Sequence, residues 1–292
     1  MPSLRRLLGA LDPDTHVRGR QWERICRWYL HNDPVYKSQI RKTWPWKSWP
    51  GRWGGDAGID LVAEMNDGSL MAVQAKAYSE SYYVTKADLD SFLSESSRPK
   101  FSRRLLIATT NRMGATALRT LRAQNVPAAF LALGDLERAQ VDWPVSPDDL
   151  RPRRLPPKKP RAHQRQAVAA VQCGFRTSDR GKLVMACGTG KTLVGLWAAE
   201  SLKTTRTLLL FPSLTLLAQT LREWTSNATR PFETLAVCSD ETVADPDAIV
   251  GRTSDLPIRV TTDAKVIRAF LRGSGSRPTN MGPAAYRVMS VH

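Results

Sequence analysis

The first half of the chain shows helical hydrophobic spacing followed by strand-like apolar runs. Apolar residues recur at helical spacing over 18–31, which predicts an amphipathic helix. Two apolar runs then flank an Asn-Asp-Gly turn signal at 66–68, so they predict a β-hairpin. The pattern further predicts a helix over 86–95, a buried strand over 104–110, a helix over 114–124 and a closing strand over 128–133.

In the second half of the chain, apolar residues lie on both sides of a turn that contains two glycines. An apolar run at 182–185 predicts a buried strand, the turn covers 188–192, and apolar positions after it predict a helix. We also expect a helix over 161–173, a buried strand over 207–212 and a helix that starts at 213. Strands alternating with helices predict an α/β fold.

A tryptophan-rich segment precedes the hairpin. Four of the nine tryptophans fall within 43–53, where prolines and a glycine rule out a helix through the segment. Rings beside Lys and Arg could stack on nucleic-acid bases. We favour the other interpretation, a loop whose rings cap a small core, because tryptophan is usually well buried.

A proline-rich basic stretch separates the two halves. Its prolines forbid regular structure, and 151–161 holds six basic residues and no acidic one. We therefore predict a first domain over 1–143, a linker over 144–160 and a second domain over 161–292. The linker is either a solvated spacer or a contact for DNA phosphates through its basic side chains, namely Arg153, Arg154, Lys158 and Lys159.

Composition favours a nucleic-acid partner and a soluble, cytoplasmic protein. The chain has 43 Lys and Arg against 27 Asp and Glu, a formal net charge of +16. Such an excess favours a polyanion, and double-stranded DNA is the partner we expect. No apolar run approaches the roughly 20 residues of a membrane span. The four cysteines show no metal-ligand spacing.

Three side chains suited to phosphodiester cleavage converge on the hairpin. A turn centred near Asp67 pairs residues whose numbers sum to about 134, which places Asp60 opposite Gln74. Gln74 and Lys76 share a face because side chains alternate along a strand. Asp60 and Gln74 offer oxygen ligands for Mg²⁺ or Mn²⁺, and Lys76 could orient or deprotonate water or stabilise the phosphate. Glu23 on the preceding helix could add a carboxylate. The alternative is a structural hairpin with surface charges.

The glycine turn has the chemistry of a nucleotide phosphate site. Its glycines let backbone N–H groups surround an anion at a helix N-terminus. Lys191 would reach the β- and γ-phosphates of ATP, and the Thr192 hydroxyl would ligate Mg²⁺. The predicted turn consists of Gly188, Thr189, Gly190, Lys191 and Thr192. The full motif has a glycine where this chain has Met185, and an ordinary strand–turn–helix is the alternative.

Two short stretches resemble the Mrr-like branch of the PD-(D/E)xK nucleases. They are Gly-Ile-Asp-Leu-Val-Ala at 58–63 and Val-Gln-Ala-Lys-Ala-Tyr at 73–78. The resemblance implies an αβββαβ core with Asp60 as the metal-binding aspartate and Gln74 and Lys76 as the Q-x-K half. It also implies that Glu23 is the glutamate of the first helix.

The second half resembles superfamily 2 helicases, which often relax the first glycine of the turn. The resemblance implies that Gln164 reads the adenine edge. It further implies that Ser213 and Thr215 hold a DNA phosphate at a helix start. We considered Asp240 and Glu241 as the acidic Walker B pair. We set them aside because the run before them ends in Cys-Ser and lies 49 residues after Lys191.

The order of these motifs is similar to the front end of the type ISP restriction enzymes. This implies a PD-(D/E)xK restriction-endonuclease-like domain followed by a partial RecA-like P-loop helicase lobe. The implied function is Mg²⁺-dependent DNA cleavage together with binding of ATP and DNA. In that family a second helicase lobe, a methyltransferase and a target-recognition domain follow.

We therefore expect a truncated or frameshifted chain with incomplete ATPase activity, since no Walker B pair is found. Two alternatives stay open. One is a non-enzymatic DNA- and ATP-binding remnant of a truncated restriction helicase. The other is an unrelated ATPase with a structural N-terminal domain.

Overall fold

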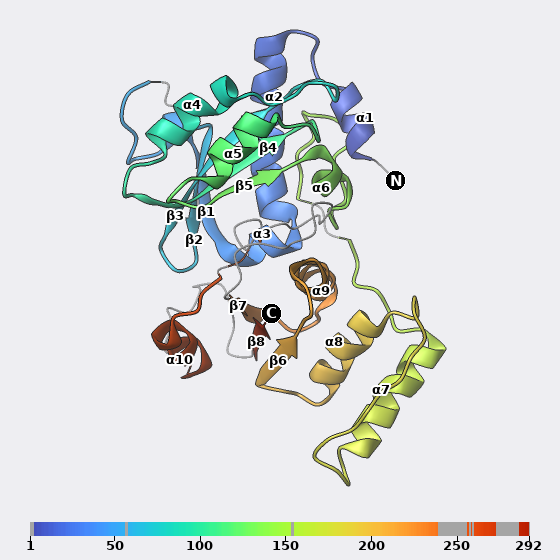
Figure 1. The fold of residues 1–292 in the computed structure, drawn as a ribbon. Helices are drawn as coiled ribbons and strands as arrows, with labels where there is room; N and C mark the ends of the chain where they lie inside the picture. Colours follow the sequence, from blue (N-terminus) through green and yellow to red (C-terminus); the bar gives the residue numbers. More distant parts are fainter. Residues whose placement is uncertain are drawn as a thin grey trace. The chain divides into compact units, whose positions relative to one another are not determined.

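The computed structural model describes residues 3–55, 58–152, 155–238, 256, 258, 260–272 and 286–291. The chain divides into two compact units, Met1–Leu155 and Pro156–His292. Each unit combines helices with a sheet (Figure 1). The predicted α/β fold is confirmed.

Five described strands form the sheet of the first unit, in the order β1-β2-β3-β4-β5. β1–β2 and β2–β3 pair antiparallel, whereas β3–β4 and β4–β5 pair parallel. Leu61 pairs with Val73 and Val62 with Ala72, so the predicted hairpin register is confirmed. The strands are β1 (Ile40–Pro45), β2 (Leu61–Met65), β3 (Leu70–Lys76), β4 (Phe101–Ala108) and β5 (Ala128–Leu131).

Helices cover both faces of this sheet. One face packs against α1 (Leu4–Gly9), α2 (Thr15–Asn32), α3 (Pro34–Gln39) and α6 (Leu133–Glu137). The other face packs against α4 (Lys86–Glu95) and α5 (Ala115–Arg122), which lie in front of the strands in Figure 1. The predicted helices at 18–31, 86–95 and 114–124 are confirmed. The closing strand ends earlier than expected because α6 begins at Leu133.

The tryptophan segment belongs to the core. Trp46 and Trp49 are buried and pack with Phe101, while Trp44 and Trp53 lie half-buried at the same cluster. The interpretation as core-capping rings is confirmed. The sequence pattern did not predict that Trp44 lies in strand β1 or that η1 (Trp46–Ser48) is a 3₁₀ turn. This turn matters for the site, because the Trp46 amide donates a hydrogen bond to the Asp60 carbonyl at 2.8 Å.

The described strands of the second unit form a parallel sheet in the order β6-β8-β7. α8 (Lys191–Ser201) and α9 (Leu214–Asn227) pack together and contribute Leu196 and Trp224 to its core. The strands are β6 (Arg206–Leu210), β7 (Phe232–Val237) and β8 (Tyr286–Val291), and the other helices are α7 (Ala162–Gly174) and α10 (Ala264–Arg272).

The strand predicted at 182–185 is wrong. These residues join no described strand, and Val184 is 78% exposed. The strand predicted at 207–212 forms as β6, but Leu208 and Leu210 are exposed rather than buried. An apolar run indicates that a segment favours burial, but only a neighbouring strand can supply the ladder of hydrogen bonds.

The described part of the linker has neither helix nor strand, as its prolines predict. It is not solvated throughout. Trp28 Nε1 donates to the Arg151 carbonyl at 2.9 Å in the first unit. In the second unit the Lys158 amide donates to Asn227 Oδ1 at 2.8 Å. Arg153 and Arg154 lie outside the described residues.

Candidate active site

The hairpin anchors Asp60 at one end of the sheet. The Asp60 amide donates to the Val73 carbonyl at 3.0 Å, and Asp60 Oδ2 accepts from the Ala75 amide at 2.7 Å. Ala75 stands between Gln74 and Lys76, so the Asp60 carboxylate is fixed at the level of these two residues. Asp60 directly precedes β2, and Lys76 is the last residue of β3.

Gln74 holds a buried carbonyl oxygen without a partner. Its side chain is 3% exposed, and Oε1 has no hydrogen-bond partner among the described residues. Gln74 alternates with Val73 and Ala75, so it lies on the sheet face that α4 and α5 cover. Lys76 is half-buried on that same face. A buried carbonyl left unpaired costs free energy, and a bound cation could satisfy it.

Glu23 belongs to a helix that packs against the other face of the sheet. It lies on α2, one turn before the buried Cys26. Burial raises the pKa of the Cys26 thiol well above its ordinary value, and the charges of Asp60 and Glu23 raise that pKa further. Both carboxylates are therefore within electrostatic range of one thiol. In the described parts of the chain, no three His, Cys, Asp or Glu side chains group as metal ligands. A cation would thus depend on the Gln74 amide as well as carboxylates.

The loop before Asp60 is pressed against α4. Gly58 has a φ of +62°, and a Cβ there would lie 2.8 Å from Ser91 Oγ and 3.0 Å from the Phe92 nitrogen. Gly54 has a similar φ of +67°, but a Cβ there would meet nothing within 4 Å. Of these two glycines, Gly58 alone combines a positive φ with a close approach to another element.

We expect Gly58→Ala to destabilise the fold and displace Asp60. Positive φ alone should cost about 1–3 kcal/mol at either glycine. The contact with the Phe92 backbone should add about 1–3 kcal/mol at Gly58. Thermal unfolding of Gly58→Ala, with Gly54→Ala as the matched control, measures the difference. Equal unfolding temperatures for the two variants would contradict the close approach.

A tyrosine network follows Lys76 and was missed in the sequence. The Tyr78 and Tyr82 rings stack with centroids 4.2 Å apart, and the Tyr82 hydroxyl donates to Asp88 Oδ2 at 3.0 Å. Burial, followed by its hydrogen bond to Asp88, raises the pKa of Tyr78 well above its ordinary value. Burial alone would raise the pKa of Asp88, but hydrogen bonds from Thr85 and both tyrosines lower it. The Thr-x-x-Asp spacing at 85–88 is typical of a capping box, and it was the sequence signal that could have placed Asp88 at the start of this helix.

The glycine turn is shaped as a phosphate loop. Gly188 and Gly190 have φ values of +76° and +82°, and α8 starts at Lys191. The Lys191 ammonium donates to the carbonyls of Met185 and Ala186, at 3.3 and 3.1 Å. An exposed lysine held across an open loop can exchange these carbonyls for phosphate oxygens.

Gln164 supports this loop. Its side chain is 6% exposed, its Nε2 donates to the Thr189 carbonyl at 2.9 Å, and its Oε1 accepts from the Arg161 amide at 2.8 Å. Thr192 is half-buried behind the turn, where its carbonyl accepts from Trp224 Nε1 at 2.9 Å. The structure therefore brings Gln164 against Thr189 rather than leaving its amide open.

The candidate DNA contacts lie apart from one another along the chain. Ser213 caps α9, with its Oγ accepting from the Leu216 amide at 3.3 Å, and Thr215 is half-buried in the first turn. Lys158 forms an ion pair with Glu223 at 3.0 Å, whereas Lys159 is exposed. Asp240 and Glu241 lie outside the described residues.

Two family models match successive parts of the chain. A restriction endonuclease family matches residues 31–150, which include Asp60, Gln74 and Lys76. The res subunit family of type III restriction enzymes matches residues 157–272, which include the phosphate loop. The chain joins a restriction endonuclease domain to a helicase-like domain. No curated protein matches the chain.

Solved structures support the resemblance to type ISP enzymes. The structure "ATP-dependent Type ISP restriction-modification enzyme LlaBIII bound to DNA" is similar over 94% of this chain, with 29% identity and a TM-score of 0.76. The chain spans 18% of that enzyme's length. A nuclease-deletion mutant of the type ISP enzyme LlaGI, in complex with a DNA substrate mimic, is 33% identical over 46% of this chain and 13% of its own. Its TM-score of 0.37 is too low to bear on the fold. The predicted similarity to the N-terminal part of these enzymes is confirmed.

Proposed function

We propose that the first unit cleaves DNA with the help of Mg²⁺ or Mn²⁺ and that the second unit binds ATP and DNA. The buried, unpartnered Gln74 Oε1 beside Asp60 and Lys76 carries the nuclease part of this proposal. A carboxylate and an amide oxygen are the ligand types that a hard cation prefers. The match to a restriction endonuclease family supports the choice of substrate.

The roles of the site residues follow from their chemistry. Asp60 and Gln74 would hold the cation, with Glu23 contributing negative charge at the margin. A bound Mg²⁺ supplies charge stabilisation at the phosphate and a more acidic water. Lys76 is cationic and half-buried, so it can donate a hydrogen bond to a phosphate oxygen or orient the attacking water. The Ala75 amide keeps the Asp60 carboxylate fixed, which reduces reorganisation during the reaction.

Lys191 and Thr192 would bind the phosphates of ATP and its Mg²⁺ in the second unit.

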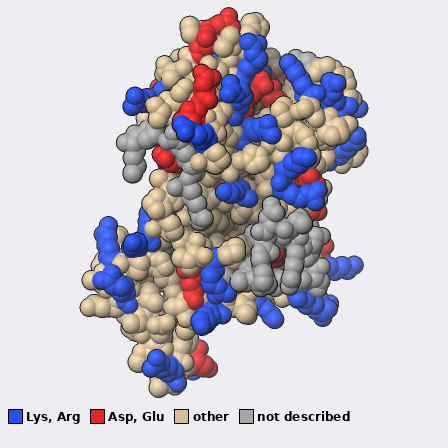
Figure 2. All heavy atoms as spheres, turned by 180° about the vertical axis from the view of Figure 1, so that it is seen from behind, with Lys and Arg blue, Asp and Glu red and all other residues tan. Residues whose placement is uncertain are grey.

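DNA would contact Ser213 and Thr215 at the start of α9 and basic residues of the linker. The distribution of charged side chains does not by itself define a single path for DNA. Figure 2 shows Lys and Arg spread over the visible face with Asp and Glu among them. Lys159 is a better phosphate contact than Lys158, whose charge is partly offset by Glu223.

Gln74→Met separates a metal-binding role from a structural one. Methionine keeps the length of the side chain and removes the unpaired carbonyl, so the metal-free chain should be as stable as the wild type, or more stable by about 1 kcal/mol. Cleavage should be lost, and added Mg²⁺ should no longer raise the unfolding temperature. Cleavage assays with Mg²⁺ and with EDTA, together with thermal unfolding, measure both effects. A less stable variant that still responds to Mg²⁺ would show that Gln74 is structural.

A further inference from the structure

An exposed tyrosine and an arginine meet at the same sheet end as Lys76. β3 and β4 run parallel, so the residues that follow them lie at a common end of the sheet. Tyr83 belongs to the loop after β3, and Arg112 follows β4. The Val84 amide donates to the Arg112 carbonyl at 3.0 Å, and the Gly114 amide donates to the Val84 carbonyl at 2.9 Å. These bonds hold the two segments side by side.

The Tyr83 ring offers a free stacking surface. Its side chain is 56% exposed, which is more than for any other described aromatic residue. The Arg112 guanidinium lies over the ring, 5.3 Å from its centroid, and Arg112 is itself exposed. The 56% exposure shows that much of the ring surface stays accessible beside the guanidinium. Neither residue belongs to the two large hydrophobic clusters described for the first unit.

Hydrogen bonds and a ring stack hold the loop that carries Tyr83. Thr110 Oγ1 lies 3.0 and 2.8 Å from the carbonyl oxygens of Glu80 and Tyr82, so its single hydroxyl hydrogen can bond either one. The Tyr78–Tyr82 stack and the Tyr82–Asp88 hydrogen bond fix the loop against α4. A ring that is already held in place loses little conformational entropy when it makes a contact.

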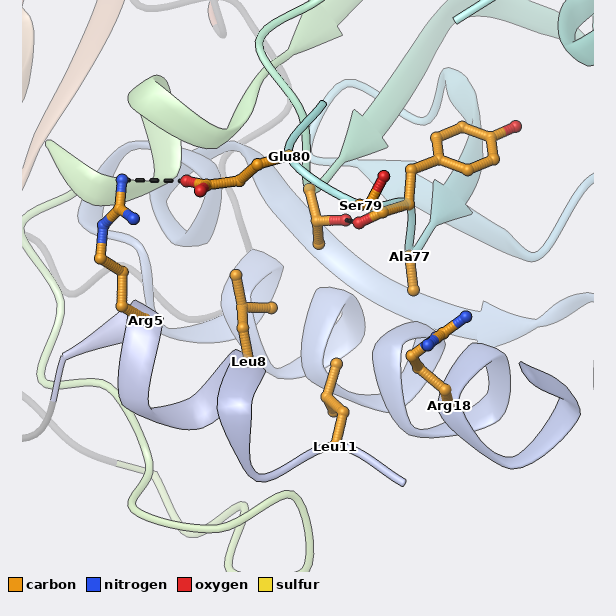
Figure 3. Close-up of a pocket in the computed structure, with 9 residues that line it drawn as sticks. Arg5, Leu8, Leu11, Arg18, Ala77, Ser79 and Glu80 are labelled. Atoms are coloured by element: carbon orange, nitrogen blue, oxygen red, sulfur yellow. Dashed lines mark hydrogen bonds and ion pairs between the residues drawn. The ribbon is translucent and has the colours of Figure 1, made fainter. Parts of the chain in front are cut away.

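The first part of this loop, 77–80, faces a separate cavity. There the loop lines a cavity of about 350 Å³ with α1 and α2 (Figure 3). Arg5 points across this cavity to Glu80, with a 2.9 Å ion pair, and also pairs with Glu137 at 2.6 Å. Its charge is thus already balanced by carboxylates. The open Tyr83–Arg112 side is the better candidate for contact with a strand at Lys76.

We propose that Tyr83 stacks on an unpaired DNA base beside the cleaved bond and that Arg112 contacts a phosphate of the same strand. Base faces are accessible in an unpaired strand, whereas a duplex offers only base edges in its grooves. The proposal rests on the proposed nuclease function and refines it. The substrate at this sheet end is DNA with a locally unpaired strand.

Photocrosslinking tests the contact without requiring cleavage. The Asp60→Asn full chain is irradiated with a single strand that contains 5-bromouracil, and with the same strand in a duplex. Mass spectrometry should find a crosslink at Tyr83 with the single strand and far less with the duplex. Tyr83→Trp should keep a crosslink at position 83, and Tyr83→Ala should lose it while peptides of the second unit still crosslink. Crosslinks in the second unit without one at Tyr83 would overturn the proposal.

The rate of cleavage and the salt dependence of DNA binding provide a second test of the proposal. Tyr83→Ala should lower kcat/KM on DNA with an unpaired bubble by roughly 5- to 100-fold, while Tyr83→Phe should stay within about twofold of the wild type. Arg112→Ala should reduce the salt slope of single-strand binding by about 0.7, and Arg119→Ala, the exposed control, should not. Equal losses on bubble and fully paired DNA would overturn the stacking role. A Tyr83 crosslink from a wild-type chain that cuts no DNA would refute the nuclease function alone.

Discussion

Replacing Lys76 with alanine should reduce DNA cleavage by about 10²- to 10⁴-fold. Lys76 ends β3 beside the carboxylate of Asp60. Its replacement by alanine removes the ammonium group that would face the DNA phosphate. The side chain is only half-buried and lies outside both hydrophobic clusters. The unfolding temperature should therefore change little. Initial rates of plasmid nicking in Mg²⁺ measure the effect, and Lys86→Ala, at an exposed lysine on α4, is the control.

Asp60→Asn tests the same site by removing a negative charge with little change of shape. Asparagine keeps an oxygen that can accept from the Ala75 amide, so the hairpin end should stay folded. The negative charge that would hold a cation is lost. We expect a similar loss of cleavage, with no stabilisation by Mg²⁺ in thermal unfolding. Undiminished cleavage by either variant would remove this end of the sheet as the active site, whereas a wild-type chain that cuts no DNA would favour the non-enzymatic alternative.

Replacing Lys191 with alanine should weaken ATP binding by about 10- to 100-fold. In the described part of the chain the Lys191 ammonium donates to two neutral carbonyls, and its bond to an anionic phosphate would be stronger than either. Titration calorimetry with Mg·ATP measures the affinity. Lys182→Ala changes an exposed lysine just before the same loop and is the matched control.

The rate of ATP hydrolysis is a separate prediction from ATP affinity. Because we set Asp240 and Glu241 aside as a Walker B pair, we expect hydrolysis to stay at the level of the Lys191→Ala variant even with DNA present. DNA-stimulated hydrolysis well above that level would assign the acidic pair to Asp240 and Glu241. An ATP affinity unchanged by Lys191→Ala would instead show that the glycine turn is structural.

Local sequence determined the hairpin and its register. The Asn-Asp-Gly turn fixes where the chain reverses, and the two-residue period of a strand then fixes which residues oppose each other. Asp60, Gln74 and Lys76 could therefore be grouped without knowledge of the rest of the fold. The helix of 86–95 was equally local, because its capping box and apolar spacing lie within the segment.

Only the tertiary structure decided what surrounds those residues. The unpaired state of Gln74 Oε1 depends on the helices that cover its face, and the nearness of Glu23 depends on how α2 packs against the other face. The 182–185 segment failed as a strand for the same reason, since pairing needs a neighbour that no apolar run can specify. The Tyr83–Arg112 pair likewise joins two loops that are brought together by parallel strands, and a parallel pairing leaves no short-range mark in the sequence.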